Sequence, residues 1–132
     1  QGVVQPPDGA ARRFTWANPD DHEPTAADLL AGAGGADSLL VLHRRFSPLT
    51  GVSAILSAAA LPAGKPGAPD TDMPARLEGE VLARLAPPLN LDNMEGLAVR
   101  TEGGRQYVYL VSDNNFNAVQ RTLLMKFELL PE

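Results

Sequence analysis

The apolar residues of this chain come in short runs, and each run is closed by residues that favour turns. Glycine and proline, twelve of each in 132 residues, exceed their ordinary combined share of about 12%. Frequent turns between short apolar runs favour strands over long helices. No run approaches the roughly 18 apolar residues of a membrane-spanning helix. The sequence therefore predicts an all-β fold without a transmembrane segment.

Seven segments are predicted as strands from their apolar content, partial alternation and flanking turns. The alanine-rich segment among them would also suit a helix, and Glu80–Ala86 fits either a strand or a short helix. The sequence Glu102-Gly103-Gly104 predicts a hairpin turn. The seven segments are Arg12–Trp16, Ser38–Phe46, the alanine-rich Val52–Leu61, Glu80–Ala86, Gly96–Thr101, Gln106–Ser112 and Thr122–Leu129.

An internal repeat connects the two halves of the chain. Glu23 and Glu95 each open a short apolar strand. In both units a second, strongly apolar strand follows, and it ends in three polar residues before a phenylalanine, which is Phe46 in the first unit and Phe116 in the second. A propeller blade takes roughly 40 to 50 residues, and a proline-rich insertion at 62–76 explains the longer first unit. We expect about two four-stranded antiparallel blades of a partial β-propeller from a larger ring.

The predicted boundaries divide one C-terminal propeller fragment, 1–132, into three parts. Residues 1–20 form an entry loop and strand, 21–90 a blade that carries the insertion 62–76, and 91–132 the closing blade. Two blades alone leave apolar faces and open strand edges uncovered. The remaining blades of the parent chain, or another copy, are the expected partners. The chain begins at Gln1 rather than Met, which suggests processing or trimming.

The net charge and the cysteine content of the sequence exclude several classes of function for this chain. The formal net charge is −5, and the short pairs Arg12-Arg13 and Arg44-Arg45 do not make the basic face of a nucleic-acid binder. A polybasic membrane anchor is also missing from the sequence. The sequence has no cysteine, so disulfides and thiolate metal sites are excluded. An exported chain fits these features, with any signal peptide already removed.

Acidic and amide side chains gather near two predicted strand ends. A hard cation such as Ca²⁺ takes six to eight oxygen ligands from carboxylates, amides and carbonyls. The competing interpretation is that Asp and Asn at strand ends cap turns through nearby backbone. The candidate metal ligands are Asp92, Glu95, Asp113 and Asn114, with Asn93 and Asn115 as further oxygen donors.

Two glutamates and two arginines are the other candidates for chemistry. If Glu23 and Glu95 share one channel, the pair suits acid/base catalysis; otherwise both are solvated turn carboxylates. Arg44 and Arg45 suit anionic substrates. Because successive strand residues face opposite ways, at most one of these arginines lies in a site. The alternative role for an arginine there is pairing with acidic residues of an adjacent blade.

The remaining polar and aromatic candidates favour structural roles. His22 and His43 occur without a catalytic motif, so hydrogen-bonded structural positions are favoured over general-base roles. Ser112 lacks a nucleophile elbow, and no P-loop, Rossmann or HExxH motif is present. The aromatic residues are expected in the core: Phe14, Trp16, Phe46, Phe116 and Phe127.

Three spaced segments resemble the C-terminal end of the phytase-like propeller family, described as having esterase-like activity of phytase. They are Leu91-Asp-Asn-Met-Glu-Gly-Leu-Ala-Val, Tyr109-Leu-Val-Ser-Asp-Asn-Asn-Phe and Gln120-Arg-Thr-Leu-Leu-Met-Lys-Phe-Glu-Leu. Upstream, Glu23-Pro-Thr-Ala-Ala and Leu42-His-Arg-Arg-Phe-Ser-Pro-Leu-Thr-Gly resemble the preceding blade. The stretch before Leu40, GAGGAD, departs from the family's usual blade turn.

The resemblance implies a periplasmic or secreted hydrolase of phosphoric or carboxylic esters, inactive as this chain alone. Ca²⁺ would polarise substrate oxygens for attack by water. Glu95, Asp113 and Asn114 would be its ligands, and Arg44 would hold the anionic group. The alternative function is a non-catalytic propeller of the bacterial envelope that binds a ligand or a protein.

Overall fold

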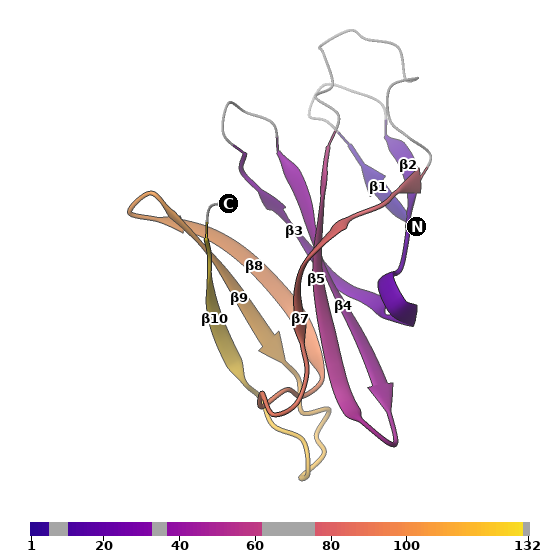
Figure 1. The fold of residues 1–132 in the computed structure, drawn as a ribbon, viewed down its shortest axis with the longest axis vertical. Helices are drawn as coiled ribbons and strands as arrows, with labels where there is room; N and C mark the ends of the chain where they lie inside the picture. The colour runs from indigo at the N-terminus through magenta and orange to yellow at the C-terminus, as the bar shows by residue number, and fades with distance from the viewer. Residues whose placement is uncertain (6–10, 33–36, 62–75, 131–132) are drawn as a thin grey trace, which may run out of the picture.

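The computed structural model describes residues 1–5, 11–32, 37–61 and 76–130. Within these ranges the chain forms three small sheets, with strand orders β1-β2-β6, β3-β4-β5-β7 and β10-β9-β8 (Figure 1). The elements are β1 Gly2–Val4, β2 Arg12–Trp16, the 3₁₀ helix η1 Pro19–Asp21, β3 Glu23–Leu30, β4 Ser38–Ser47, β5 Gly51–Ala60, β6 Arg76–Leu77, β7 Glu80–Leu85, β8 Met94–Glu102, β9 Arg105–Ser112 and β10 Leu124–Leu129.

The central sheet is an antiparallel meander of β3, β4, β5 and β7. β4 and β5 pair along their whole length, from Ser38 with Ala60 to Ser47 with Gly51. Gly51 adopts the left-handed conformation at this hairpin, with φ of 77°, which glycine tolerates without a steric penalty. The middle strands have apolar residues on both faces, as expected for strands covered on both sides.

The second large sheet is the antiparallel meander β8-β9-β10. Gly103 and Gly104 join β8 to β9 with φ of 58° and 80°. Positive φ at both central residues is typical of the two-residue hairpin turns that match strand twist. β10 alternates between half-buried and exposed residues, so one of its faces packs inward and the other faces outward.

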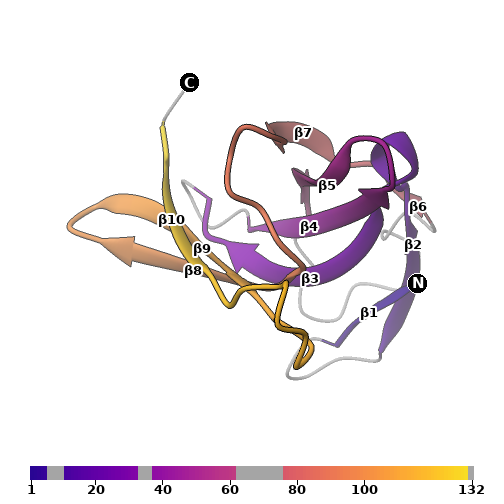
Figure 2. The same cartoon turned by 90° about the horizontal axis from the view of Figure 1, so that it is seen from below.

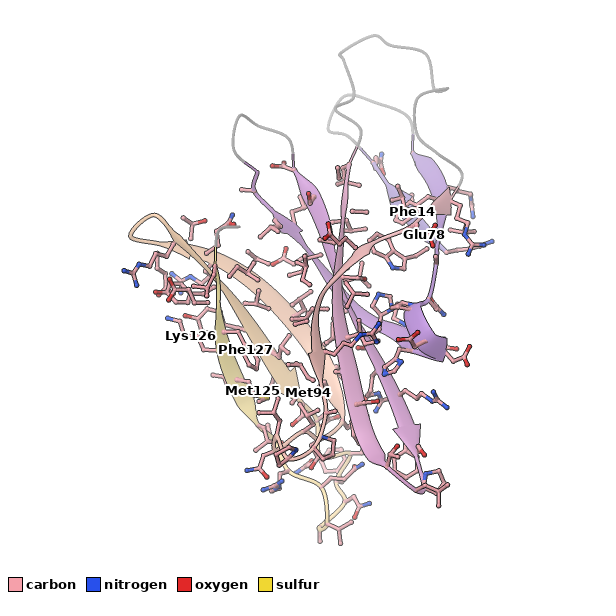
Figure 3. All side chains as sticks on the ribbon, viewed as in Figure 1. Phe14, Glu78, Met94, Met125, Lys126 and Phe127 are labelled. Atoms are coloured by element: carbon pink, nitrogen blue, oxygen red, sulfur yellow. The ribbon has the colours of Figure 1, made fainter. Side chains whose placement is uncertain are left out.

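The main core lies between these two sheets. Eight buried apolar residues form it, contributed by both sheets. Met125 and Phe127 on β10 pack against this cluster, while Lys126 lies on the opposite face of β10 (Figure 3). The core residues are Leu40, Leu42, Ala54, Leu56, Leu85, Met94, Val108 and Leu110.

The small sheet β1-β2-β6 packs against the other face of the central sheet. Trp16 on β2 approaches the ring of His43, with 6.2 Å between the ring centroids. Ala17 N donates to Leu77 O at 2.9 Å, which ties the end of β2 to the parallel strand β6. Figure 2 shows β2 and β6 on one side of β4, and β8 on the other. The central sheet is therefore covered on both faces.

Most predicted strands are observed, including both ambiguous ones. Val52–Leu61 lies in strand β5 and not in a helix, and β7 covers Glu80–Leu85. The central sheet has the expected four strands, whereas the second sheet has three in the described residues. The predicted insertion lies outside the described residues at 62–75, and Arg76 belongs to β6. No helix in the described part is long and apolar enough to cross a membrane.

The prediction that all five aromatic residues lie in the core was wrong for two of them. Phe14 is buried and Phe127 packs on the core. Phe46 is 68% exposed, and Phe116 is fully exposed. Phe46 lies one residue before the end of β4, and Phe116 lies in the turn after β9 with φ of 55°. Aromatic character alone therefore does not separate the core positions from these two exposed ones.

Candidate functional site

β3 and β8, the strands that open the two large sheets, lie next to each other. Thr25 Oγ1 on β3 donates a hydrogen bond to Met94 O at 3.1 Å. Farther along, Asp28 Oδ2 accepts a hydrogen bond from Val99 N at 2.7 Å. Two side chains of β3 thus hold the backbone of β8 at two points. The start of β8 is thereby fixed beside the start of β3, where the repeat places its two glutamates.

Glu23 and Arg44 share one face of the central sheet. They are cross-strand partners in the β3–β4 register, and such partners point to the same side. Alternation along β4 places Arg44 on the face of the core residue Leu42, and Arg45 on the opposite face. Arg44 is half-buried, whereas Arg45 is exposed. Neither arginine forms an ion pair within the described residues.

Glu95 lies at an irregularity in β8. The β8–β9 register shifts between Met94 and Gly96, so Glu95 has no partner on β9. A bulge of this kind redirects the side chain of the extra residue. Glu95 is exposed and accepts a hydrogen bond from Asn93 Nδ2. β3 also has a register shift near its start, between Pro24 and Ala26, but it lies two residues after Glu23, whereas the shift in β8 is at Glu95 itself.

Asp92 is buried and uses both carboxylate oxygens to hold the backbone. Oδ1 accepts from Asn93 N at 2.9 Å, and Oδ2 accepts from Arg121 N at 2.9 Å. Asp113 N donates to Asn93 O at 3.0 Å. These bonds connect the segment before β8 to both ends of the 113–121 loop. Charge–dipole bonds of this type are stronger than neutral ones.

Asp113 and Asn114 cap the turn that follows β9. Asp113 Oδ1 accepts from Asn115 N at 3.2 Å, and Asn114 Oδ1 accepts from Phe116 N at 3.1 Å. Asn115 Nδ2 contacts Gln120 Oε1 at 3.4 Å. These bonds to backbone two residues ahead are the usual role of Asp and Asn in turns. The turn-capping interpretation therefore describes their contacts in this structure.

The fit of Ca²⁺ to these residues can be judged from the oxygens that are already used. In the described part of the chain, no three His, Cys, Asp or Glu side chains come together to hold a metal. Asp92, Asp113 and Asn114 already accept backbone bonds, and Glu95 accepts one from Asn93. Ca²⁺ needs six to eight oxygens. The described residues do not assemble that set.

The two histidines take structural positions against serines. His43 is fully buried, and its Nε2 lies 2.9 Å from Ser57 Oγ. His22 Nε2 lies 2.9 Å from Ser53 Oγ, and its Nδ1 lies 2.9 Å from Asp20 O. Burial lowers the pKa of His43 to about 4, because the charged ring loses its hydration. His43 is therefore neutral at physiological pH.

Ser112 is also structural. It is buried, and its Oγ donates to Arg121 O at 2.7 Å while accepting from Leu123 N at 2.8 Å. Both hydrogen-bonding directions of the hydroxyl are thus used by the backbone of the segment that precedes β10. This geometry agrees with the expectation that Ser112 is no nucleophile.

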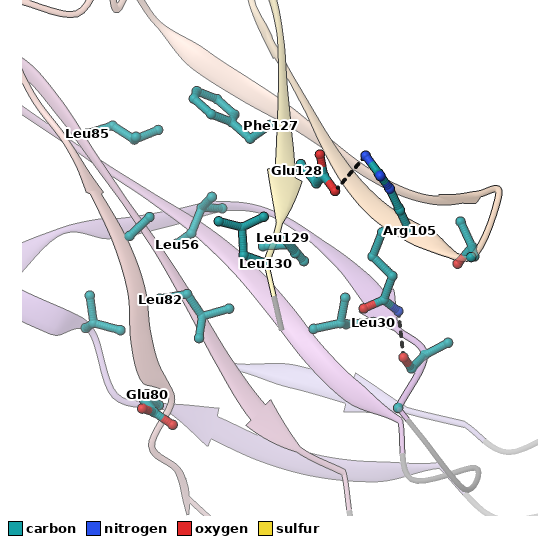
Figure 4. Close-up of a pocket in the computed structure, with 17 residues that line it drawn as sticks. Leu30, Leu56, Glu80, Leu82, Leu85, Arg105, Phe127, Glu128, Leu129 and Leu130 are labelled. Atoms are coloured by element: carbon teal, nitrogen blue, oxygen red, sulfur yellow. Dashed lines mark hydrogen bonds and ion pairs between the residues drawn. The ribbon is translucent and has the colours of Figure 1, made fainter. Parts of the chain in front are cut away.

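A groove in the described part of the chain lies away from the candidate carboxylates. It has a volume of about 1330 Å³ and lies between β7 and β10 (Figure 4). Apolar side chains line it from both sheets, including Leu56, Leu85 and Phe127. Arg105 and Glu128 form an ion pair at its border, with 3.5 Å between Nη1 and Oε1. The groove lacks the candidate site residues.

Sequence reasoning missed Thr25, Asp28 and the groove. Asp28 had a local signal, because a carboxylate inside the apolar stretch Ala26–Leu30 requires a partner when it is buried. The groove had none, since it depends on which strands become neighbours. Its apolar residues look like ordinary core positions in the sequence.

Face-to-face packing of small meander sheets, with their opening strands side by side, defines an all-β protein compatible with part of a β-propeller. A family described as phytase-like, with esterase-like activity of phytase, matches residues 7–116. The chain belongs to this phytase-like family. The match includes Glu23, Arg44, Glu95 and Asp113, and it ends before β10. No curated protein and no solved structure matches the chain.

Proposed function

We propose that this chain forms part of a hydrolase of phosphoric or carboxylic esters, with its site at the starts of β3 and β8. The family match carries the proposal, because it spans both opening strands and Arg44. The Thr25–Met94 bond supports it by holding the two strand starts together. Export to the periplasm or the medium is part of the same proposal.

Each residue has a distinct role in the proposed site. Glu95, redirected by the bulge in β8, acts as the acid/base group for attack by water. Glu23 is the second carboxylate, on the neighbouring strand. Arg44, half-buried and without an ion pair in the described residues, binds the anionic part of the ester. Arg45 faces the other side of the sheet and has no role in catalysis.

Calcium dependence remains a prediction from the sequence. Because the described oxygens do not complete a calcium site, further ligands must come from the blades that we expect beside this chain. Calorimetric titration of Ca²⁺ into the chain, and into the longest native polypeptide that contains it, measures whether each of them binds Ca²⁺. Binding to the longer protein that is lost in Glu95→Gln supports the metal role. Equal binding by that variant contradicts it.

Turnover of p-nitrophenyl phosphate and p-nitrophenyl acetate by that longer polypeptide tests the hydrolase proposal. We expect Glu95→Gln to lower kcat by roughly 100-fold, as removal of a positioned acid/base group does. Glu80→Gln, on the exposed outer strand β7, is the matched control and should retain activity. Arg44→Ala should raise KM for the phosphate ester, whereas Arg45→Ala should leave it unchanged. Unchanged turnover in Glu95→Gln would overturn the proposal.

The alternative function is a non-catalytic propeller that binds a ligand or protein. The groove between β7 and β10 favours it, because this groove is mostly apolar and lies away from the candidate carboxylates. Apolar pockets with a few polar groups are usual binding sites. Absence of turnover for both esters in the longer native polypeptide would favour this function over hydrolysis.

A further inference from the structure

A hydrogen-bonded serine–histidine pair lies on the face of the central sheet that is opposite the main core. Ser53 Oγ on β5 lies 2.9 Å from Nε2 of His22, the residue that directly follows η1. Ser53 is the cross-strand partner of Arg45, and such partners share one side of a sheet. Arg45 faces away from Arg44, so Ser53 does too. The pair is therefore on the other side of the sheet from the site proposed above.

The second ring nitrogen of His22 decides the direction of the bond to Ser53. Nδ1 lies 2.9 Å from Asp20 O. A carbonyl oxygen only accepts hydrogen bonds, so Nδ1 carries the ring proton and is the donor. In the neutral ring Nε2 then has a free lone pair and only accepts. The Ser53 hydroxyl therefore donates to Nε2, which is how a serine nucleophile is hydrogen-bonded to its general base.

The turn before His22 holds the ring in this orientation. His22 N donates to Pro19 O at 2.9 Å, and the Asp20 carboxylate forms an ion pair with Arg84 on β7. Asp20 and Asp21 both adopt the left-handed conformation, with φ of 48° and 56°, which is uncommon for residues with a side chain. Local strain of this kind is found where a fold positions a functional group.

The two histidine–serine pairs on this face differ in how a reagent can reach them. His43 and Ser57 have the same 2.9 Å separation, but both side chains are fully buried. Ser53 is half-buried and lies two residues after the start of β5, beside a His22 ring that is only 7% exposed. A reagent from solvent therefore has access to Ser53 and not to Ser57.

We propose that Ser53 is a nucleophile for activated carboxylic esters, with His22 as its general base and the Asp20 carbonyl as the group that positions the ring. Ser53 Oγ bonds to the carbonyl carbon while its proton passes to His22 Nε2. The bond to the leaving group then breaks, and His22 returns the proton to the leaving oxygen, which leaves an acyl ester on Ser53. Water attacks this ester and gives its proton to Nε2, and the acid is released as Ser53 regains the proton.

The competing role for this hydrogen bond is to anchor η1 on the central sheet. Both roles use the same geometry, and both allow Ser53→Ala to lower stability. They differ in one product, because only a nucleophile becomes covalently modified. The carboxylate site proposed above forms no adduct on serine either, so a covalent product on Ser53 is specific to this proposal.

A fluorophosphonate with a short alkyl chain is the probe, used on the longest native polypeptide that contains the chain. Ser53 Oγ displaces fluoride from phosphorus, and mass spectrometry with fragmentation locates the adduct and follows its rate. We expect modification of Ser53 in the wild-type protein and roughly 100-fold slower modification in His22→Gln, which keeps a hydrogen-bonding side chain but no base. Ser47→Ala removes another hydroxyl of the same hairpin, one bonded to Leu49 N, and should react like the wild type.

No adduct on Ser53 in the folded wild-type protein would overturn the proposal. Equal rates of modification in wild type and His22→Gln would also overturn it, because the hydroxyl would then react without its base. Circular dichroism of each variant shows whether the fold is retained, and a rate is compared only between folded proteins.

A thiol in place of the hydroxyl tests the proton transfer without any acyl group. The chain has no cysteine, so Ser53→Cys introduces its sole thiol. An adjacent imidazole that takes the proton lowers the pKa of a thiol. We expect iodoacetamide to alkylate Ser53→Cys at pH 6 roughly tenfold faster or more than Ser53→Cys/His22→Gln. Equal alkylation rates in the two variants would show that His22 does not act as the base, and the proposal fails.

Discussion

Acidification should destabilise this protein through His43. Its side chain is fully buried between the central sheet and Trp16, and burial lowers its pKa to about 4. In the unfolded chain a histidine titrates near about 6.5. Between these values the unfolded state binds a proton that the folded state does not. The stability contributed by neutral His43 is therefore present above about pH 6.5 and is lost as the pH falls toward 4.

The expected loss follows from the two pKa values. Going from pH 7.5 to pH 5, proton binding by the unfolded state should lower the free energy of unfolding by about 2 kcal/mol for this group alone. Urea unfolding at both pH values measures the total change, which includes every carboxylate. The same pair of measurements on His43→Gln, which cannot titrate and retains a donor that can reach Ser57, isolates the contribution of His43.

The comparison is a difference of differences, so the packing defect of the substitution itself cancels. His22→Gln serves as the control for the neighbouring histidine, which is hydrogen-bonded to Ser53. We expect the wild-type protein to lose about 2 kcal/mol more than His43→Gln between the two pH values. Equal losses in wild type and His43→Gln would refute the reasoning from burial.

Three further predictions concern the contacts between and around the sheets. Asp28→Ala should lower the free energy of unfolding by about 1–3 kcal/mol in urea denaturation, because Val99 N loses its acceptor; Asp37→Ala, exposed before β4, is the control. Gly79→Ala should lower the free energy of unfolding by about 1–3 kcal/mol in the same urea denaturation, because the added methyl group meets the Trp16 ring and lies 3.1 Å from Ser57 Cβ. An unchanged free energy of unfolding would show that the neighbouring side chains move to make room for the methyl group. Lys126→Met should raise the pKa of Glu102, followed by carbon NMR titration, because the hydrogen bond from Lys126 is the main cause of its lowered pKa; an unmoved titration would assign the lowering to Tyr109 instead.

The sequence predicted the strands well because each is a local pattern. Ser38–Phe46 and Val52–Leu61 differ from β4 and β5 by a residue at each end or less. The double glycine at 103–104 identified the hairpin, since few residues tolerate positive φ at both positions. These features depend on neighbours in sequence.

The arrangement of the candidate site depended on longer-range contacts. The bulge at Glu95 and the bond from Thr25 to Met94 follow from pairing between distant strands. Asp92 and Asp113 looked equally available as ligands in the sequence. Whether a carboxylate binds a cation or backbone is decided by which N–H groups the fold brings near, and Arg121 N reaches Asp92 across 29 positions.

The way β3 holds β8 has a consequence for how relatives of this chain can diverge. Thr25 and Asp28 bond main-chain atoms of Met94 and Val99, not their side chains. A main-chain partner is present whatever residue occupies the position. Substitution should thus be restricted at 25 and 28 and much freer at 94 and 99, subject only to packing. Sequence drift on β8 can then reshape the interior while the angle between the two sheets is inherited unchanged.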